Sequence, residues 1–171
     1  MIPATSDVVV FGALLAGAGA GAVIDLRTRR VPNVVTASLA LTGIGLAATG
    51  LSGVTFGASM LGLAVGLALM LPGHIFGATG AGDVKLFAAI GSVVGSGRVV
   101  HAFLDVAVVG GVIALLVAAR RRQLKQTVGG AASLIASAGG TRAVIESAGR
   151  SNRFAYAPAI AIGALLAALG V

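Results

Sequence analysis

The 171-residue sequence contains no cysteine and no tryptophan, and only 10% of its residues are charged. Without cysteine there can be no disulfide bond, thiol nucleophile or cysteine-ligated zinc or iron–sulfur site. The two histidines, His74 and His101, lie far apart in the sequence and make a poor metal site, so no metal or other cofactor is expected. A soluble domain typically has about 25% charged residues, so the shortage of charge also argues against a water-soluble protein.

Apolar residues are abundant instead: they make up 57% of the chain, and the mean hydropathy is +1.05. A soluble core of this size could not bury so much apolar surface, whereas a bilayer accepts it on every side of a helix bundle. The net charge of +7 does not indicate nucleic acid, because the basic residues form short clusters between apolar runs. We therefore expect an integral membrane protein that contacts lipid.

Six apolar segments approach the length of about 20 residues that a membrane-spanning helix needs. The fourth is short and contains three glycines. The first ten residues carry Asp7 but no Lys or Arg, so no cleavable signal peptide is expected. The segments are residues 8–24, 34–50, 54–71, 84–97, 99–119 and 155–171.

The basic residues indicate how these segments are oriented. With six crossings and both termini outside, the basic residues of 27–30, Lys85 and those of 120–153 face the cytoplasm, and only Arg98 lies outside. The positive-inside rule favours this orientation. We therefore expect an all-α, multi-pass protein of the inner (cytoplasmic) membrane with about six transmembrane helices. It forms a single domain, 1–171, with residues 120–153 as a cytoplasmic loop between spans five and six.

Two further patterns concern the loop and the glycines. A basic cluster at the start of the loop is expected to bind anionic lipid headgroups, and a weakly amphipathic helix is expected over 131–148. Glycines four residues apart allow helix backbones to approach closely. The cluster is Arg120, Arg121, Arg122 and Lys125, and the glycine pairs are Gly17/Gly21, Gly53/Gly57, Gly62/Gly66 and Gly91/Gly95.

Only five residues are acidic, and a carboxylate at the centre of a membrane helix costs about 2.5–3.5 kcal/mol. Asp7 precedes the first span and is expected to be solvated, and Glu146 to pair with Arg142 on a helix surface in the loop. Asp105 lies one helical turn after His101 near the outer end of span five, where an interhelical hydrogen bond with or near His101 is expected.

Asp25 and Asp83 remain, and both belong to the inner interface. Asp25 ends the first span and precedes a run of arginines, so it could be an interfacial carboxylate balanced by those charges. Pro32 and Asn33 then favour the start of span two, because proline suits a first helical turn. Asp83 follows a glycine-rich turn and is expected to be the N-cap of span four.

Two carboxylates at one depth also suit a particular chemistry. If helix contacts bring Asp25 and Asp83 within a few ångströms, the pair tends to share one proton. An aspartic peptidase uses such a pair: one carboxylate takes a proton from water as the water attacks, and its partner donates to the peptide carbonyl. The sequence gives the shared depth but not the distance.

Three short motifs carry a resemblance to a known family. They are Asp25-x5-Val31-Pro32-Asn33, then Gly80-Ala81-Gly82-Asp83-Val84-Lys85, and finally the proline-containing segment Tyr156 to Ala161. In this order the chain resembles the type IV prepilin peptidases, which are membrane aspartic peptidases with a GxGD motif.

The resemblance implies that Asp25 and Asp83 are the catalytic pair, with Gly80, Gly82, Pro32, Asn33 and Lys85 as supporting or substrate-binding residues. It implies a substrate as well, the short basic leader of a prepilin or pseudopilin, cut after a glycine at the cytoplasmic face. Lys85 is expected either to reach the inner headgroups or to pair with an acidic group of the substrate.

The chain departs from the larger bacterial members, which carry paired cysteines in an added N-terminal part and also methylate the new pilin N-terminus. It is therefore expected to resemble the minimal, peptidase-only branch associated with Flp (tight-adherence) pili, and archaeal preflagellin peptidases are similar too. Two rival interpretations stay open: a small ion- or proton-coupled transporter, and a catalytically silent pilus-assembly protein. The sequence does not predict the oligomeric state.

Overall fold

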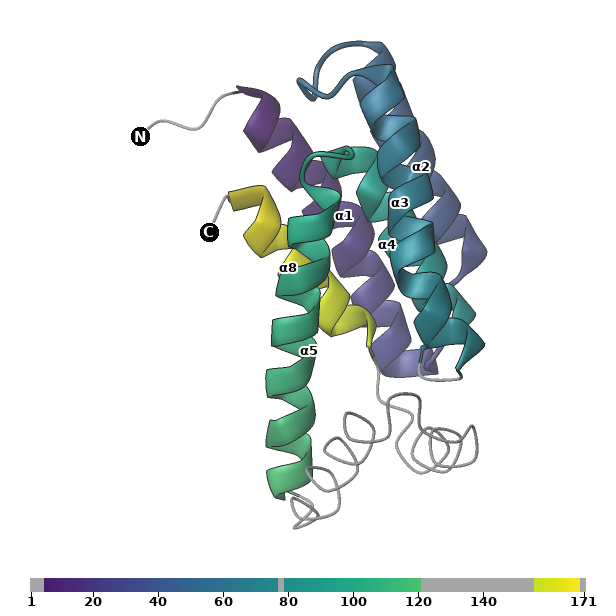
Figure 1. The fold of residues 1–171 in the computed structure, drawn as a ribbon, viewed down its shortest axis with the longest axis vertical. Helices are drawn as coiled ribbons and strands as arrows, with labels where there is room; N and C mark the ends of the chain where they lie inside the picture. Colours follow the sequence, from purple (N-terminus) through teal and green to yellow (C-terminus); the bar gives the residue numbers. More distant parts are fainter. Residues whose placement is uncertain (1–4, 77–78, 121–155, 170–171) are drawn as a thin grey trace.

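The computed structural model describes residues 5–76, 79–120 and 156–169, and within these ranges it contains six helices and no strand. Each of the six apolar segments predicted from the sequence contains or largely overlaps one helix, so the all-α fold class is confirmed for the described residues (Figure 1). The helices are α1 (Thr5–Thr28), α2 (Asn33–Ala48), α3 (Phe56–Ile75), α4 (Ala81–Val94), α5 (Val99–Arg120) and α8 (Ala157–Leu169).

The lengths and surfaces of the helices suit a bilayer. In the described part of the chain, three helices are long and apolar enough to cross one, at Thr5–Thr28, Phe56–Ile75 and Val99–Val117, while α2 and α8 are shorter apolar helices. Large apolar side chains cover the outside of the bundle, including Val34 (77% exposed) and Leu41 (69% exposed). Such a surface would be costly in water and suits lipid. The protein is a membrane protein.

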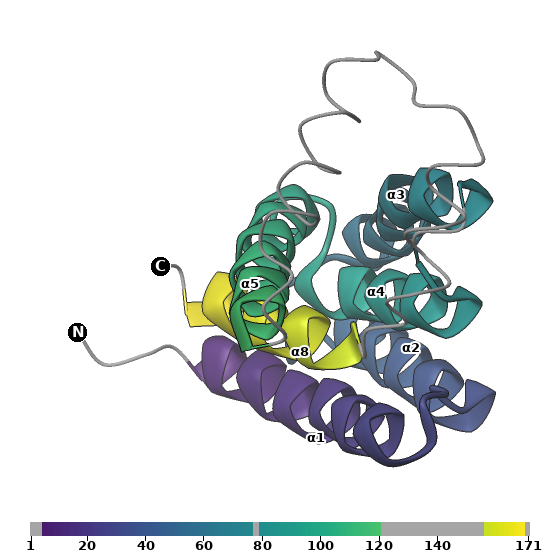
Figure 2. The same ribbon diagram turned by 90° about the horizontal axis from the view of Figure 1, so that it is seen from below.

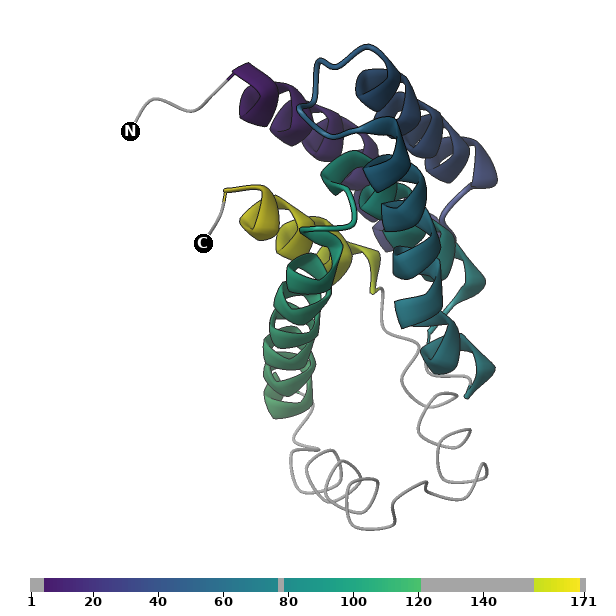
Figure 3. The ribbon, with the colours of Figure 1, turned by 45° about the horizontal axis from the view of Figure 1, so that its top comes forward.

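Seen from one end, α4 lies between α2 and α3, and α8 lies between α1 and α5 (Figure 2). The helix α4 is the most buried: nine consecutive residues from Leu86 to Val94 are all buried. Its Phe87 meets Phe103 of α5 edge to face, with ring centroids 5.9 Å apart. This short helix is therefore the centre of the bundle, and the other described helices surround it (Figure 3).

Contacts between loops show that the helices alternate in direction. The Arg98 guanidinium lies 3.6 Å from the Asp7 carboxylate, which places the turn between α4 and α5 beside the first turn of α1. In the same turn, the Ser96 N–H donates to the carbonyl of Ala58 in the first turn of α3 (3.0 Å). The ends of α1 and α3 and the start of α4 therefore lie at the other end of the bundle. The prediction for Asp7 needs correcting, because it is paired as well as partly solvated.

Glycines bring α3 and α4 into backbone contact. A Cβ added to Gly62 would overlap the Gly91 carbonyl oxygen, and one added to Gly91 would overlap that of Gly62. Near this contact, Ser59 of α3 donates to the Ser92 carbonyl (2.7 Å). The pair Gly53/Gly57 was predicted wrongly: Gly53 lies in a loop with φ +66°, and Gly57 faces open space.

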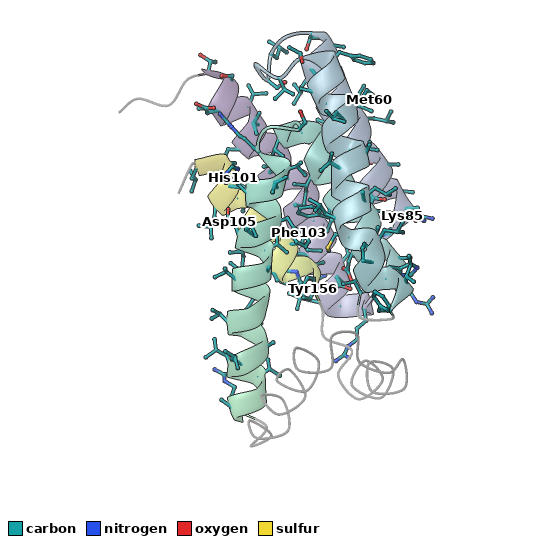
Figure 4. The ribbon with its side chains drawn as sticks, viewed as in Figure 1. Met60, Lys85, His101, Phe103, Asp105 and Tyr156 are labelled. Atoms are coloured by element: carbon teal, nitrogen blue, oxygen red, sulfur yellow. The ribbon has the colours of Figure 1, made fainter. Side chains whose placement is uncertain are left out.

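Other predictions concern residues remote from α4. Figure 4 shows His101 and Asp105 on α5, and neither side chain makes a hydrogen bond within the described ranges, so the bond expected between them is not found. The predicted pair of Glu146 with Arg142, the helix over 131–148 and the basic cluster beyond Arg120 lie outside the described residues.

Candidate active site

Asp25 lies in the last turn of α1 and is only 6% exposed. The helix ends three residues later at Thr28, and the next residue, Arg29, adopts a left-handed conformation (φ 53°) and donates its N–H to the Asp25 carbonyl (2.7 Å). For a residue with a side chain this conformation costs about 1–2 kcal/mol. The sharp reversal directs the chain through Val31 and Pro32 into α2. This helix begins here, as predicted, but Pro32 is its N-cap and Asn33 its first residue, so the proline precedes the first turn.

Asp83 lies in the first turn of α4, ahead of the apolar part of that helix and outside the three helices long enough to cross a bilayer. The prediction that Asp83 is the N-cap is wrong, because the N-cap is Gly80 and Asp83 is the third helical residue. Its side chain still satisfies a free helix-end donor, since Oδ2 accepts the N–H of Gly80 at 3.2 Å. This is the carboxylate half of a capping box, which holds the carboxyl group in a defined orientation.

Two contacts join the segment that precedes α2 to the segment that begins α4. A Cβ added to Gly82 would lie 3.1 Å from the Val31 Cβ, so the absence of a side chain lets the two segments touch. Beside them, Lys85 Nζ donates to Asn33 Oδ1 at 3.0 Å. Gly80 has an ordinary backbone conformation (φ −74°), so its role is not a special turn. The two motifs identified in the sequence thus lie together, and between them they contain all seven predicted site residues.

A third segment reaches the same place from the far end of the chain. The backbone N–H of Ala157, the first residue of α8, interacts with the Asp25 carboxylate as a hydrogen-bond donor. Tyr156, immediately before it and labelled in Figure 4, lies within range of the Asp83 charge. In the sequence this segment is marked only by its resemblance to the family motif, and no other sequence signal predicts these contacts.

The two carboxylates are close enough for the charge of Asp25 to act on Asp83. The Asp25 Oδ2 atom is buried and accepts no hydrogen bond from any described residue, although the Arg29 charge acts on the same carboxylate. Burial raises the pKa of Asp83 from its ordinary 3.8 to about 6, the Gly80 N–H acts against this rise, and the Asp25 charge adds to it. Two carboxyl groups that interact in this way tend to share one proton.

The raised pKa predicts that Asp83 destabilises the folded protein at neutral pH. A carboxylic acid with a raised folded-state pKa loses stability as pH rises from the unfolded value through the folded one, here from 3.8 to about 6. Asp83→Asn keeps an oxygen that can accept the Gly80 N–H but carries no charge. Its melting temperature in detergent should therefore exceed that of the wild type at about pH 7.5, and the difference should disappear at about pH 4. An equal or lower melting temperature at the higher pH would contradict this prediction.

A scan against protein-family models matches residues 10–115 to the type IV leader peptidase family. The match covers more than half of the chain, runs from α1 into α5 and includes both Asp25 and Asp83. The chain belongs to the type IV leader peptidase family. This membership makes the protein a peptidase, and thus a hydrolase.

For this leader peptidase, no curated protein and no solved structure gives a significant match. Within its described residues, no group of three or more His, Asp or Glu side chains is placed to hold a metal ion. The chemical groups gathered at the end of the bundle are two carboxyls, a backbone N–H and a phenol.

Proposed function

We propose that the protein is an aspartic peptidase in which Asp25 and Asp83 activate water to cut the leader from prepilins or pseudopilins. The observation that carries the proposal is that two carboxylates from α1 and α4, each partly or fully removed from water, lie close enough for the charge of Asp25 to act on Asp83. Asp25 is fixed by the end of α1, and Asp83 by the N–H of Gly80.

The reaction needs one proton shared by this pair. The ionised carboxyl takes a proton from water as the water oxygen bonds to the peptide carbonyl carbon, and the protonated carboxyl gives its proton to the carbonyl oxygen. When the tetrahedral intermediate collapses, the C–N bond breaks, the departing nitrogen receives the proton held by one carboxyl, and a hydroxyl group of the intermediate gives its proton to the other, ionised carboxylate. The pair then again holds one proton, and no cofactor takes part.

We place the reaction at the cytoplasmic face of the inner membrane. Four basic residues lie at the end of the bundle that carries the Asp25–Asp83 pair (the dyad): Arg27, Arg29, Arg30 and Lys85. Their position supports the orientation favoured by the positive-inside rule, with six crossings and both termini outside. The substrate is a short basic leader cut after a glycine, and the apolar pilin helix that follows stays in the membrane. We assign the chain to the peptidase-only, Flp type, without N-methyltransferase activity.

A cleavage assay tests the proposal. Purified protein in liposomes, incubated with a prepilin that carries its leader, should release the leader by one cut after its last glycine, as read by mass spectrometry. EDTA should leave the rate unchanged. If several Flp-type prepilins, type IV prepilins and archaeal preflagellins all stayed intact, the peptidase proposal would be rejected in favour of a transporter or a silent assembly protein.

A further inference from the structure

The hydroxyl of Tyr156 rests in a notch of α5 that one glycine creates. A Cβ added to Gly110 would lie 2.8 Å from the Tyr156 Oη and 3.1 Å from its Cζ. The adjacent Gly111 is exposed and has open space around it. The phenol ring therefore spans from the start of α8 to the middle of α5, and only a glycine at position 110 leaves room for it.

The segment that begins α8, Tyr156 and Ala157, interacts with both Asp25 and Asp83. Ala157 directs its backbone N–H to Asp25, while Tyr156 lies within range of the Asp83 charge. The Tyr156 side chain is only partly buried, and its hydroxyl makes no hydrogen bond with a described residue. The Tyr156 hydroxyl is thus held in place by its ring, and its proton is not engaged in a hydrogen bond with any described residue.

We propose that Tyr156 is a third catalytic residue, whose hydroxyl donates a hydrogen bond to the carbonyl oxygen of the scissile peptide as that oxygen gains negative charge. The inference rests on the proposed function. The dyad supplies one proton to that oxygen, and a second fixed donor stabilises the developing charge further, most effectively where water is excluded. A phenol keeps its proton at neutral pH and can act as this donor.

Tyr156→Phe isolates the hydroxyl, because the ring that occupies the notch remains. We expect kcat to fall about 100-fold, KM to change less than about twofold and the melting temperature to stay unchanged. A purely structural role predicts the opposite result, with a lower melting temperature and a normal kcat. A kcat within about twofold of the wild-type value would overturn the proposal.

Two neighbouring glycines provide a matched pair of variants. Gly110→Ala should displace the hydroxyl and lower kcat at least about tenfold, whereas Gly111→Ala should leave cleavage unchanged. Because both Gly110→Ala and Tyr156→Phe remove the same donor, the double variant should be no slower than Tyr156→Phe alone. Losses that multiply in the double variant would contradict a shared mechanism.

The outcomes separate this inference from the proposed function. If the wild type cuts prepilin, both aspartate variants do not, and Tyr156→Phe cuts normally, then only the role of Tyr156 is rejected. If the wild type cuts none of the prepilins tested, the peptidase proposal is rejected and the role of Tyr156 is rejected with it.

Discussion

Asparagine in place of Asp25 or Asp83 is expected to slow leader cleavage by about 10²–10⁴-fold, the usual contribution of a general acid or base. Each substitution removes one member of the pair, so the remaining carboxyl can either accept a proton from water or donate one, but not both in the same step. The two losses should be similar, and the double variant should be little slower than either single one, because the pair acts as a unit. Initial rates of leader release in liposomes measure the effect.

Two other carboxylates serve as controls. Asp105 lies on α5, and Asp7 pairs with Arg98 at the opposite end of the bundle. Asp105→Asn and Asp7→Asn should both cut prepilin at close to the wild-type rate. Since Asp83→Asn is also expected to be more stable than the wild type at neutral pH, its lost activity could not be attributed to unfolding. More than about a tenth of the wild-type rate in either dyad variant would reject the assignment.

Gly62→Ala is expected to cause a large loss of folded protein for the addition of a single methyl group. The new methyl group would overlap a backbone carbonyl of α4, and no side-chain rotation relieves such an overlap, so α3 and α4 must separate. Overpacking of this kind costs about 1–3 kcal/mol or more. Size-exclusion chromatography in detergent should show less monodisperse protein, with a lower melting temperature and lower activity in the fraction that remains.

Gly57→Ala is the matched control, because this glycine lies in the same helix and faces open space. It should behave as the wild type does or be slightly more stable, since alanine has the higher helix propensity. Equal stability of the Gly62 and Gly57 variants would show that the close contact between α3 and α4 is not formed in the membrane.

Hydropathy was sufficient to predict the helices, because each apolar run long enough for a bilayer became one helix. It could not predict that the shortest run, α4, forms the centre of the bundle. Helices that are apolar on every side carry little information about which face meets a neighbour. The spacing of Gly53 and Gly57 matched that of Gly62 and Gly66, yet only the second pair contacts another helix.

For the site, too, the sequence predicted some features but not others. Charge distribution placed Asp25 and Asp83 at one depth, and the motifs suggested that they act together. The contact between Gly82 and Val31 and the bond between Lys85 and Asn33 depend on how α4 is rotated, which no local pattern encodes. The role of Ala157 depends on a backbone N–H, and a backbone group has no signature in the sequence.

The position of α8 has a consequence for biosynthesis. It is the last of the described helices to leave the ribosome, yet it lies between α1 and α5, and its first N–H reaches Asp25. Until it inserts, the nascent chain already contains both aspartates but lacks the segment that approaches them. The enzyme therefore becomes competent only late in its own synthesis, and a chain truncated before Tyr156 should be inserted but inert.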